Sequence, residues 1–347
     1  MTQSSTDTPQ DETLTTDRID KMAFAASQSG VLIAALELDL FTAISEGFNE
    51  PAKFAERTKV PVDSVDRLMS ACVGLKLIEK EDGKFFNTPD VDAFLVKGKT
   101  SYCGDFFTIQ PKVDYNVWND IVPSLRQSVP ENKKPNKGYY FEDSQSARDY
   151  AVALYNLRWK GAQRFARRFD FSSYSLFLDL GGGAGTYSIA AAQEHSHLRA
   201  IVFDYANVIP VAEEYIQKAG VSDRVKTVSG DFLDTEFPGG ADLAAYITCL
   251  QVYGPEDVQF LVNKAFNALV PGGGLIIIDY MMNEDKTGHP GALFCHLYQK
   301  CISPENPGYV NTPTEFRDYL MKAGFVDILA REPRYGPMGF VFGKKPR

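Results

Sequence analysis

Leu176–Thr186, with the sequence LFLDLGGGAGT, is the stretch that decides the fold. Its first five residues are almost entirely apolar, and this pattern predicts a short buried strand. The glycines that follow predict a tight turn, because a residue without Cβ adopts unusual backbone angles and lets a ligand approach the main chain. The next segment, TYSIAAAQEH, predicts a helix whose first N–H groups are free to meet a ligand. A glycine turn alone does not distinguish one cofactor from another.

Four further strands are predicted after this stretch, with helical segments between them. They are RAIVFDY (199–205), VKTVSGD (225–231), ADLAAYIT (241–248) and GGLIIIDYM (273–281). Apolar strands that alternate with helices predict a parallel sheet covered by helices on both faces. The fold class is therefore α/β and doubly wound, and a ligand is expected at the carboxyl ends of the strands.

Acidic residues stand where three of these strands end. Asp179 precedes the glycines, and Asp204 ends the second strand about 20 residues beyond the turn. An acid at that second position accepts the hydroxyls of a ribose. Asp231 and Phe232 follow the third strand and suit an adenine. Asp204 alone also fits a helix cap, and Asp231 alone a turn. As a set, the residues predict an adenosyl cofactor without a pyrophosphate, bound by Asp179, Gly181, Gly183, Gly185, Asp204, Asp231 and Phe232.

The N-terminal part of the chain has a different pattern. Residues 1–16 are polar and predict a disordered tail. From Asp17 to Ile44 a helical pattern is too continuously apolar for a simple amphipathic helix, so we expect it to be buried in a core or in a subunit interface. Two helices and a hairpin around Asp82-Gly83 follow, in the order that is typical of a winged helix.

A winged helix raises the question of DNA binding, which needs a surplus of basic residues. The expected recognition helix, 62–75, carries Asp63 and Asp66 against Arg67. The chain of 347 residues has a net charge of −9 and a pI near 5.1. We therefore expect no nucleic-acid partner and a structural role for the wing.

Other features of the sequence exclude further classes of protein. No apolar run reaches the roughly 18 residues that span a bilayer, and the N-terminus lacks the features of a signal peptide, so no membrane partner is expected. Five cysteines without a CxxC pair are typical of reduced thiols in a cytoplasmic protein. The four histidines include only one close pair, His195-Ser-His197, so no metal site is predicted.

Several blocks of sequence carry a family resemblance. The blocks are DFSSYSLFLDLGGGAGTYSIAAA, VFDYANVI, RVKTVSGDFLDTEFPGGADL, ALVPGGGLIIIDYMM, TPTEFRDYLMKAGF and, near the N-terminus, LIAALELDLFTAI. They resemble class I S-adenosylmethionine-dependent methyltransferases, and within them the small-molecule O-methyltransferases of plant phenolic and bacterial antibiotic pathways. The resemblance implies a Rossmann-like methyltransferase domain, an N-terminal all-helical winged-helix dimerisation domain, a homodimer, and S-adenosyl-L-methionine as cofactor.

The resemblance also implies where the parts lie. The expected domains are a disordered tail (1–16), the dimerisation domain (17–105), a helical linker that contributes to the substrate pocket (106–170) and the cofactor-binding domain (171–347). Asp179 and the glycines would lie along the methionine end of the cofactor, Asp204 would bind ribose, and Asp231 with Phe232 would bind adenine.

One departure from the family pattern concerns the proton. Where the family usually has Leu-His-Asp-Trp-Pro, with the His as general base, this chain has Leu250-Gln-Val-Tyr-Gly-Pro255. Gln251 stands at the His position, and an amide takes no proton near neutral pH. Three explanations remain open: an acceptor that needs no base, a different base, or a relative of the family that binds the cofactor without transferring methyl.

Tyr253 and His296 are the candidates for a different base. A carbon methyltransferase of bacteriochlorophyll biosynthesis also lacks the family His and has a Tyr and a His in similar places. The plain alternatives are core packing for Tyr253 and a locally bonded helical residue for His296. The expected function is methyl transfer to a small or medium aromatic acceptor, at oxygen in preference to carbon or nitrogen. The expected catalytic residues, which would orient that acceptor, are Gln251, Tyr253 and His296.

Overall fold

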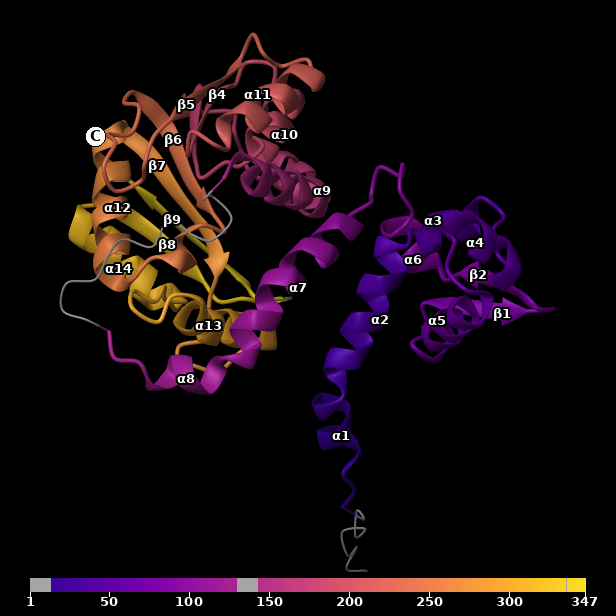
Figure 1. The fold of residues 1–347 in the computed structure, drawn as a ribbon. Coiled ribbons are helices and arrows are strands. Elements are labelled where there is room, and N and C mark those ends of the chain that lie inside the picture. Colours follow the sequence, from indigo (N-terminus) through magenta and orange to yellow (C-terminus); the bar gives the residue numbers. More distant parts are fainter. Residues whose placement is uncertain (1–13, 130–142, 335) are drawn as a thin grey trace, which may run out of the picture. The chain divides into compact units, whose positions relative to one another are not determined.

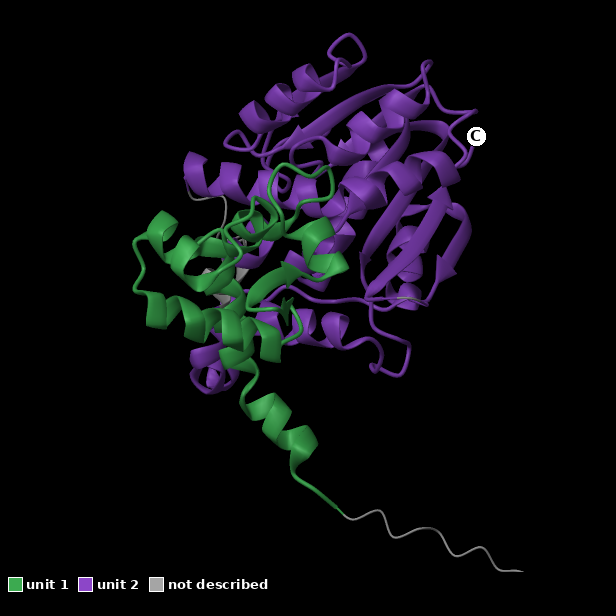
Figure 2. Ribbon diagram, turned by 90° about the vertical axis from the view of Figure 1, so that its right-hand side faces the viewer, with its two compact units in different colours: residues 1–104 green, residues 105–347 purple. Residues whose placement is uncertain are grey.

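The chain divides into two compact units (Figure 2). The structure is a computed structural model that describes residues 14–129, 143–334 and 336–347, without the side chains of 110–114. Most of the expected tail, 1–16, lies outside these residues. One unit ends at Gly104 and the other begins at Asp105. The helices within the expected linker, 106–170, group with the C-terminal unit.

The N-terminal unit is a bundle of short helices with a two-stranded wing. Its buried core includes Leu40, Phe41, Phe54, Met69 and Phe85. Pro51 and Pro89 stand in the first turns of their helices, where a missing N–H costs nothing. The elements are α1 (Asp17–Ala23), α2 (Ala25–Glu37), α3 (Leu40–Ser45), α4 (Pro51–Thr58), α5 (Val62–Gly74), β1 (Ile78–Glu81), β2 (Lys84–Asn87) and α6 (Pro89–Phe94).

The wing confirms the predicted hairpin, and with it the unit is not entirely helical. Strands β1 and β2 are antiparallel and joined by Asp82 (φ 47°) and Gly83 (φ 77°). Two positive φ angles in succession make the tight turn that Asp-Gly favours. On α5, the lone basic residue of the helix, Arg67, lies 4.0 Å from the carboxylate of Asp63.

The apolar N-terminal helix is broken, contrary to the single continuous pattern predicted. Helix α1 ends at Ala23, α2 begins at Ala25, and Asp39 with φ 58° separates α2 from α3. Residues 14–30 are exposed within this chain, including Ile19, Met22 and Phe24. Among the described residues no single helix is long and apolar enough to cross a membrane, although α1 and α2 taken as a bent pair meet the length and composition requirement.

The C-terminal unit is built on a seven-stranded sheet (Figure 1). The order of its strands is β5-β4-β3-β6-β7-β9-β8, and the first five are parallel. The strands are β3 (Leu176–Leu180), β4 (Arg199–Asp204), β5 (Val225–Ser229), β6 (Ala241–Ile247), β7 (Leu269–Tyr280), β8 (Val326–Arg331) and β9 (Met338–Lys344). All five predicted strands are confirmed. The antiparallel pair β8 and β9 was not predicted.

Helices cover both faces of the sheet, as the doubly wound pattern predicted. Figure 1 shows α12 (Pro255–Ala268) and α14 (Pro313–Ala323) on one side and α9 (Ser144–Arg168), α10 (Thr186–Glu194) and α11 (Ile209–Lys218) on the other. Leu178 and Leu180 of β3 belong to the hydrophobic core on the side of α12 and α14, whereas Phe177 belongs to the core on the side of α10 and α11. This division follows from the alternation of side chains along a strand. The other helices of the described residues are α7 (Gly104–Asn119), α8 (Ile121–Arg126), the 3₁₀ turn η2 (Leu250–Val252) and α13 (Pro290–Ile302).

Candidate active site

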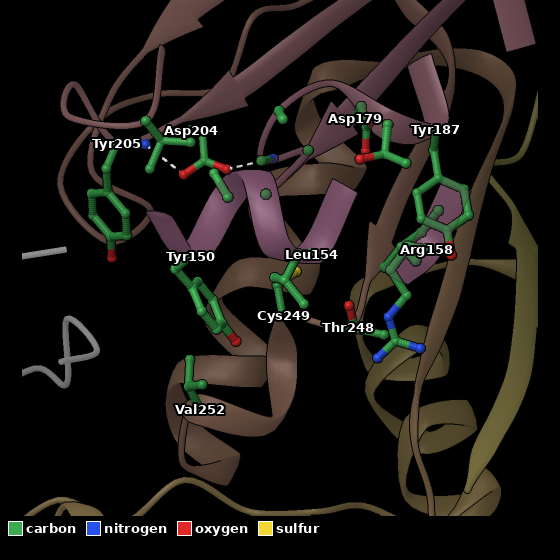
Figure 3. Close-up of a pocket in the computed structure, with 18 of the residues that line it drawn as sticks. Tyr150, Leu154, Arg158, Asp179, Tyr187, Asp204, Tyr205, Thr248, Cys249 and Val252 are labelled. Atoms are coloured by element: carbon green, nitrogen blue, oxygen red, sulfur yellow. Dashed lines mark hydrogen bonds between the residues drawn. The ribbon is translucent and has the colours of Figure 1, made fainter. Parts of the chain in front are cut away.

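A pocket lies where β3, β4 and β6 end, at the carboxyl edge of the sheet. Helix α9, the glycine turn, the residues after β4 and β5, and η2 supply its walls, and Figure 3 shows ten of the residues by name. Its lining includes Tyr150, Leu154, Arg158, Asp179, Gly181, Gly182, Gly183, Thr186, Tyr187, Asp204, Tyr205, Phe232, Thr248, Cys249, Gln251, Val252 and Tyr253. Seven of the ten predicted site residues meet here. Gly185, Asp231 and His296 are not among the lining residues.

The glycine turn owes its shape to positive φ angles and to close packing. Gly181, Gly183 and Gly185 have φ values of 77°, 57° and 77°. A Cβ on Gly182 would lie 2.8 Å from the carboxyl carbon of Asp179, so no larger residue fits there without movement. Gly185 precedes α10, and a Cβ there would pack against hydrocarbon side chains of α10, β4 and α11. The first glycines therefore shape the pocket, and Gly185 lets the helix approach the sheet.

Asp179 is buried under the glycine turn. Its Oδ2 accepts hydrogen bonds from the main-chain N–H (3.2 Å) and the hydroxyl (2.7 Å) of Ser188. Burial raises the pKa of this carboxyl to about 6, against the lowering effect of the two Ser188 bonds. Because both bonds use Oδ2, Oδ1 is left for a donor on a ligand.

Asp204 links the end of β4 to the glycine turn. One carboxylate oxygen accepts the N–H of Gly183 at 2.8 Å, and the other accepts the N–H of Tyr205 at 2.7 Å, as the dashed lines in Figure 3 show. Burial raises the pKa of Asp204 to about 6. An ionised carboxylate has about four acceptor positions, so two remain for a pair of hydroxyls.

Phe232 forms an aromatic wall of the pocket. Its ring packs edge-on against Phe203 and Tyr205, each at a centroid distance of 5.4 Å. Asp231 makes a hydrogen bond within its own loop, because its Oδ1 accepts the N–H of Leu233 at 2.9 Å. The structure thus brings Phe232 to the pocket and gives Asp231 a role in shaping the loop that carries it.

The turn after β6 presents Gln251. Thr248 has a φ of 57°, which is unusual for a β-branched residue. The Gln251 amide donates from Nε2 to the carbonyl of Thr248 at 3.2 Å. Oδ2 of the buried Asp279 accepts the N–H of Leu250 at 2.8 Å, and Oδ1 accepts that of Tyr280 at 2.7 Å. Burial raises the pKa of Asp279 to about 7. Sequence reasoning missed Asp279, which holds the start of this turn.

Tyr253 is poorly suited to remove a proton. Its hydroxyl lies 3.2 Å from the hydroxyl of Tyr205. Burial is the main reason that the pKa of Tyr253 is well above its usual value of 10. A phenol with such a pKa stays protonated near neutral pH, so it can orient a ligand but has no phenolate to act as a base.

His296 lies on α13, close to residues 309–310, which run beside the end of the turn after β6. The main-chain N–H of Val310 donates to its Nδ1 at 3.3 Å, and its ring meets that of Tyr309 edge-on at 4.9 Å. The N–H of Tyr309 in turn donates to the carbonyl of Tyr253 at 3.1 Å. Burial and the nearby Lys286 lower the pKa of His296, which favours neutral imidazole. With Nδ1 occupied as an acceptor, the proton of the neutral ring is on Nε2, so Nε2 is a donor.

Arg158 is a pocket residue that sequence reasoning missed. It comes from the middle of α9, and Figure 3 shows its side chain and that of Tyr187 directed into the pocket. Its buried Nε has no hydrogen-bond partner among the described residues. No pattern in the helical sequence distinguishes this arginine from Arg164, Arg167 or Arg168 on the same helix.

The pocket fits the expected cofactor group by group. Arg158 suits the carboxylate of its amino-acid end, and the free oxygen of Asp179 suits the ammonium group. Asp204 has two acceptor positions for the ribose hydroxyls, and Phe232 offers a ring face or edge to the adenine. The described residues include no cluster of three or more His, Cys, Asp or Glu side chains able to hold a metal ion. His195 and His197 each lie against a main-chain carbonyl, at 2.8 and 3.2 Å.

The chain matches two domain families. Residues 138–326 match the O-methyltransferase domain, and residues 21–97 match the O-methyltransferase dimerisation domain. A tetracenomycin polyketide synthesis 8-O-methyl transferase of Streptomyces glaucescens is 29% identical over 330 residues, 94% of this chain and 95% of that protein. An L-tyrosine C(3)-methyltransferase of Streptomyces lavendulae is 28% identical over 313 residues, 87% of this chain and 84% of that protein.

A solved structure shares the fold. Human N-acetylserotonin methyltransferase, in complex with S-adenosylmethionine, aligns with a TM-score of 0.84 at 22% identity and covers 98% of this chain and 100% of its own. The glycine turn, the buried acids and the family match agree with one another. The chain belongs to the O-methyltransferase family and is an S-adenosylmethionine-dependent methyltransferase.

Proposed function

We propose that this protein methylates a small or medium-sized aromatic acceptor of cytoplasmic secondary metabolism, with oxygen the favoured atom. One observation carries the proposal: a single pocket joins the groups that suit the cofactor to Gln251 and Tyr253, on and just after the turn that follows β6. By their names, one similar protein is an 8-O-methyl transferase of tetracenomycin polyketide synthesis and another methylates C(3) of L-tyrosine. Carbon is therefore an alternative to oxygen, and nitrogen is another, since a further similar protein is named an N,N-dimethyltransferase.

The residues assigned to the cofactor divide its length among them. Arg158 and Asp179 would hold the amino-acid end, Asp204 the ribose, and Phe232 the adenine. Gly181 and Gly183 let the main chain approach, and Gly185 and Asp231 keep the turn and the adenine loop in shape. When bound, the cofactor supplies an electrophilic methyl group.

The residues of this chain would orient the acceptor, and none of Gln251, Tyr253 and His296 is suited to act as a strong base. Gln251 accepts no proton, and Tyr253 is protonated and bonded to Tyr205. His296 is a neutral donor through Nε2 if it keeps its bond to Val310. This set suits an acceptor that is already ionised or that attacks through an electron-rich carbon or an amine. Alignment of the reacting atoms then provides the rate enhancement, which for well-oriented reactants is about 7–11 kcal/mol at most.

The active form is proposed to be a homodimer. The family's dimerisation domain spans residues 21–97, and the segment around its start, α1 and the residue that follows it, exposes Ile19, Met22 and Phe24 by 59%, 64% and 67%. Large apolar side chains that are this exposed along one short segment mark a surface that another protein covers.

Methyl transfer is tested with S-adenosylmethionine that carries a labelled methyl group and a panel of phenols, indoles and chlorins. The expected result is a labelled product and S-adenosylhomocysteine with at least one aromatic acceptor. Position of the label on oxygen, carbon or nitrogen identifies the reacting atom. Tight cofactor binding without turnover of any acceptor would speak for a non-transferring relative of the family.

Cofactor affinity should depend on pH through Asp204. Only the ionised carboxylate accepts two hydroxyls, and its pKa is raised to about 6. Protonation of Asp204 alone should lower the affinity for S-adenosylhomocysteine about tenfold from pH 7 to pH 5, and protonation of Asp179 over the same range should lower it further, as calorimetric titration would show. Without cofactor, the effect of pH on folding stability has the opposite sign. The raised pKa of Asp204 stabilises the fold at low pH, and this contribution is lost as the pH rises through about 6. Asp204→Asn should bind weakly and lose its own share of the pH dependence, while Asp179, whose pKa is also raised to about 6, keeps the rest. An unchanged pH profile would remove Asp204 from the site.

His296 should affect the acceptor and not the cofactor. His296→Ala should lower kcat/KM for the acceptor by about tenfold, the usual effect of losing one hydrogen bond to a charged or strongly polar group. His296→Gln should retain much of the activity, because its amide N–H takes the place of Nε2–H. Gln251→Ala should have a smaller effect than His296→Ala. If the glutamine variant is as impaired as the alanine variant, His296 acts as a base instead of a donor.

The dimer is tested by light scattering after size exclusion. The wild type should have twice the mass of the 38.5 kDa chain. Replacing Met22 and Phe24 by Asp should give a monomer that is still folded by circular dichroism. Replacing Val122, which is 52% exposed and lies outside the dimerisation domain, by Asp is the control and should leave the mass unchanged. A monomeric wild type would contradict the proposal.

A further inference from the structure

Lys264 is a buried lysine outside the pocket. It is one of the buried residues of α12 and is only 6% exposed. Lysine is rarely buried to this extent, because removing an ammonium group from water is costly unless other groups replace the water. Its surroundings therefore show what it does.

The ammonium group of Lys264 is held by main-chain oxygens and by aromatic rings. Nζ donates to the carbonyl of Phe232 at 2.6 Å and to that of Thr235 at 2.7 Å. It also lies 4.4 Å from the ring centre of Phe237 and 5.5 Å from that of Phe260. Both carbonyls belong to the loop after β5, so the lysine connects this loop to α12.

The loop has its own internal hydrogen bonds, and these fix only its local shape. The N–H of Asp231 donates to the hydroxyl of Thr235 at 3.0 Å, and the N–H of Thr235 donates to the carbonyl of Asp231 at 2.9 Å. At its start, the N–H of Gly230 donates to the carbonyl of Asp204 at 3.0 Å. Beyond that point, Lys264 ties the main chain of the loop to a helix of the core.

One of the two hydrogen bonds from Lys264 is to Phe232, a residue that lines the cofactor pocket. The carbonyl that accepts the shorter of the two bonds is that of Phe232, whose ring lines the pocket. A change in this carbonyl's position rotates the peptide unit that carries the ring. The acidic side chains of Asp231, Asp234 and Glu236 lie on the same loop and favour a cation near it.

We propose that Lys264 is a positioning residue for the cofactor: from behind the loop, it fixes Phe232 at the adenine side of the pocket and so sets the affinity for the adenosyl group. The inference rests on the proposed cofactor site. Lys264 itself is not among the residues that line the cofactor pocket, which include residues of the turn after β6 (the acceptor turn, residues 248–253).

Lys345 provides a matched control within the same chain. Its Nζ donates to the carbonyls of Phe266 and Leu269, both at 2.7 Å, and lies 4.6 Å from the ring centre of Phe266. The two lysines therefore make the same kind of contact at different places. Lys264 bonds to the loop beside the cofactor pocket, whereas Lys345 bonds to the end of α12 and the start of β7. A general loss of stability is expected from removing either.

The experiment compares Lys264→Met with Lys345→Met. Calorimetric titration with S-adenosylhomocysteine should show at least a tenfold weaker affinity for Lys264→Met and less than a twofold change for Lys345→Met. Hydrogen exchange should accelerate at residues 232–235 in Lys264→Met alone. Lys264→Gln, a milder change that keeps an N–H donor, should lie between Lys264→Met and the wild type, and it decides the question if Lys264→Met does not fold.

The outcomes separate this inference from the function on which it rests. Equal affinities in Lys264→Met and Lys345→Met, with a wild type that binds normally, would overturn the positioning role and leave the cofactor site intact. A wild type that binds no S-adenosylhomocysteine would overturn both. Faster exchange at 232–235 without loss of affinity would show that the loop moves but does not set the affinity, which also overturns the inference.

Discussion

The hydrogen bond from the Gly183 N–H to the Asp204 carboxylate is the interaction on which the site depends. It joins the glycine turn after β3 to the end of β4, two elements that are adjacent in the sheet. Because the carboxylate also accepts the N–H of Tyr205, the turn, the strand end and an aromatic wall of the pocket are held by one side chain. The remaining pocket residues are arranged around this corner.

Three buried carboxylates at one edge of the sheet explain the chemistry of the site. Asp179, Asp204 and Asp279 are all fully or nearly fully buried, and burial raises the pKa of each. Main-chain N–H groups satisfy part of their bonding capacity, and Arg158 adds one positive charge. A ligand that brings an ammonium and a sulfonium group therefore suits this edge better than a nucleotide with phosphates.

The sequence predicted the parts of the site that are contiguous or that follow a strand. Asp179 and the glycines share one turn, and Asp204 and Phe232 each follow a recognisable strand, so the parallel topology brings them together. Arg158 was missed because a helical periodicity gives the face of a residue and not its distant partner. Strand β8 was missed because residues 326–331 are largely exposed and carry no buried apolar run. Strand β9 has the alternating burial of a strand, so its sequence carried a signal that was overlooked. The place of His296 beside Val310 depends on a long-range contact that no local pattern indicates.

The positive φ angle of Thr248 shows which part of the protein fixes the shape of the acceptor turn. A β-branched residue with φ of 57° costs on the order of 1–3 kcal/mol, and the neighbouring strands must supply that energy. Here the N–H of Thr248 is bonded to Ile278 on β7 at 2.7 Å, and Asp279 holds the next part of the turn. The geometry of the turn therefore belongs to the sheet around it and not to its own residues. Grafting residues 248–253 alone onto a relative would transfer their chemistry without their shape.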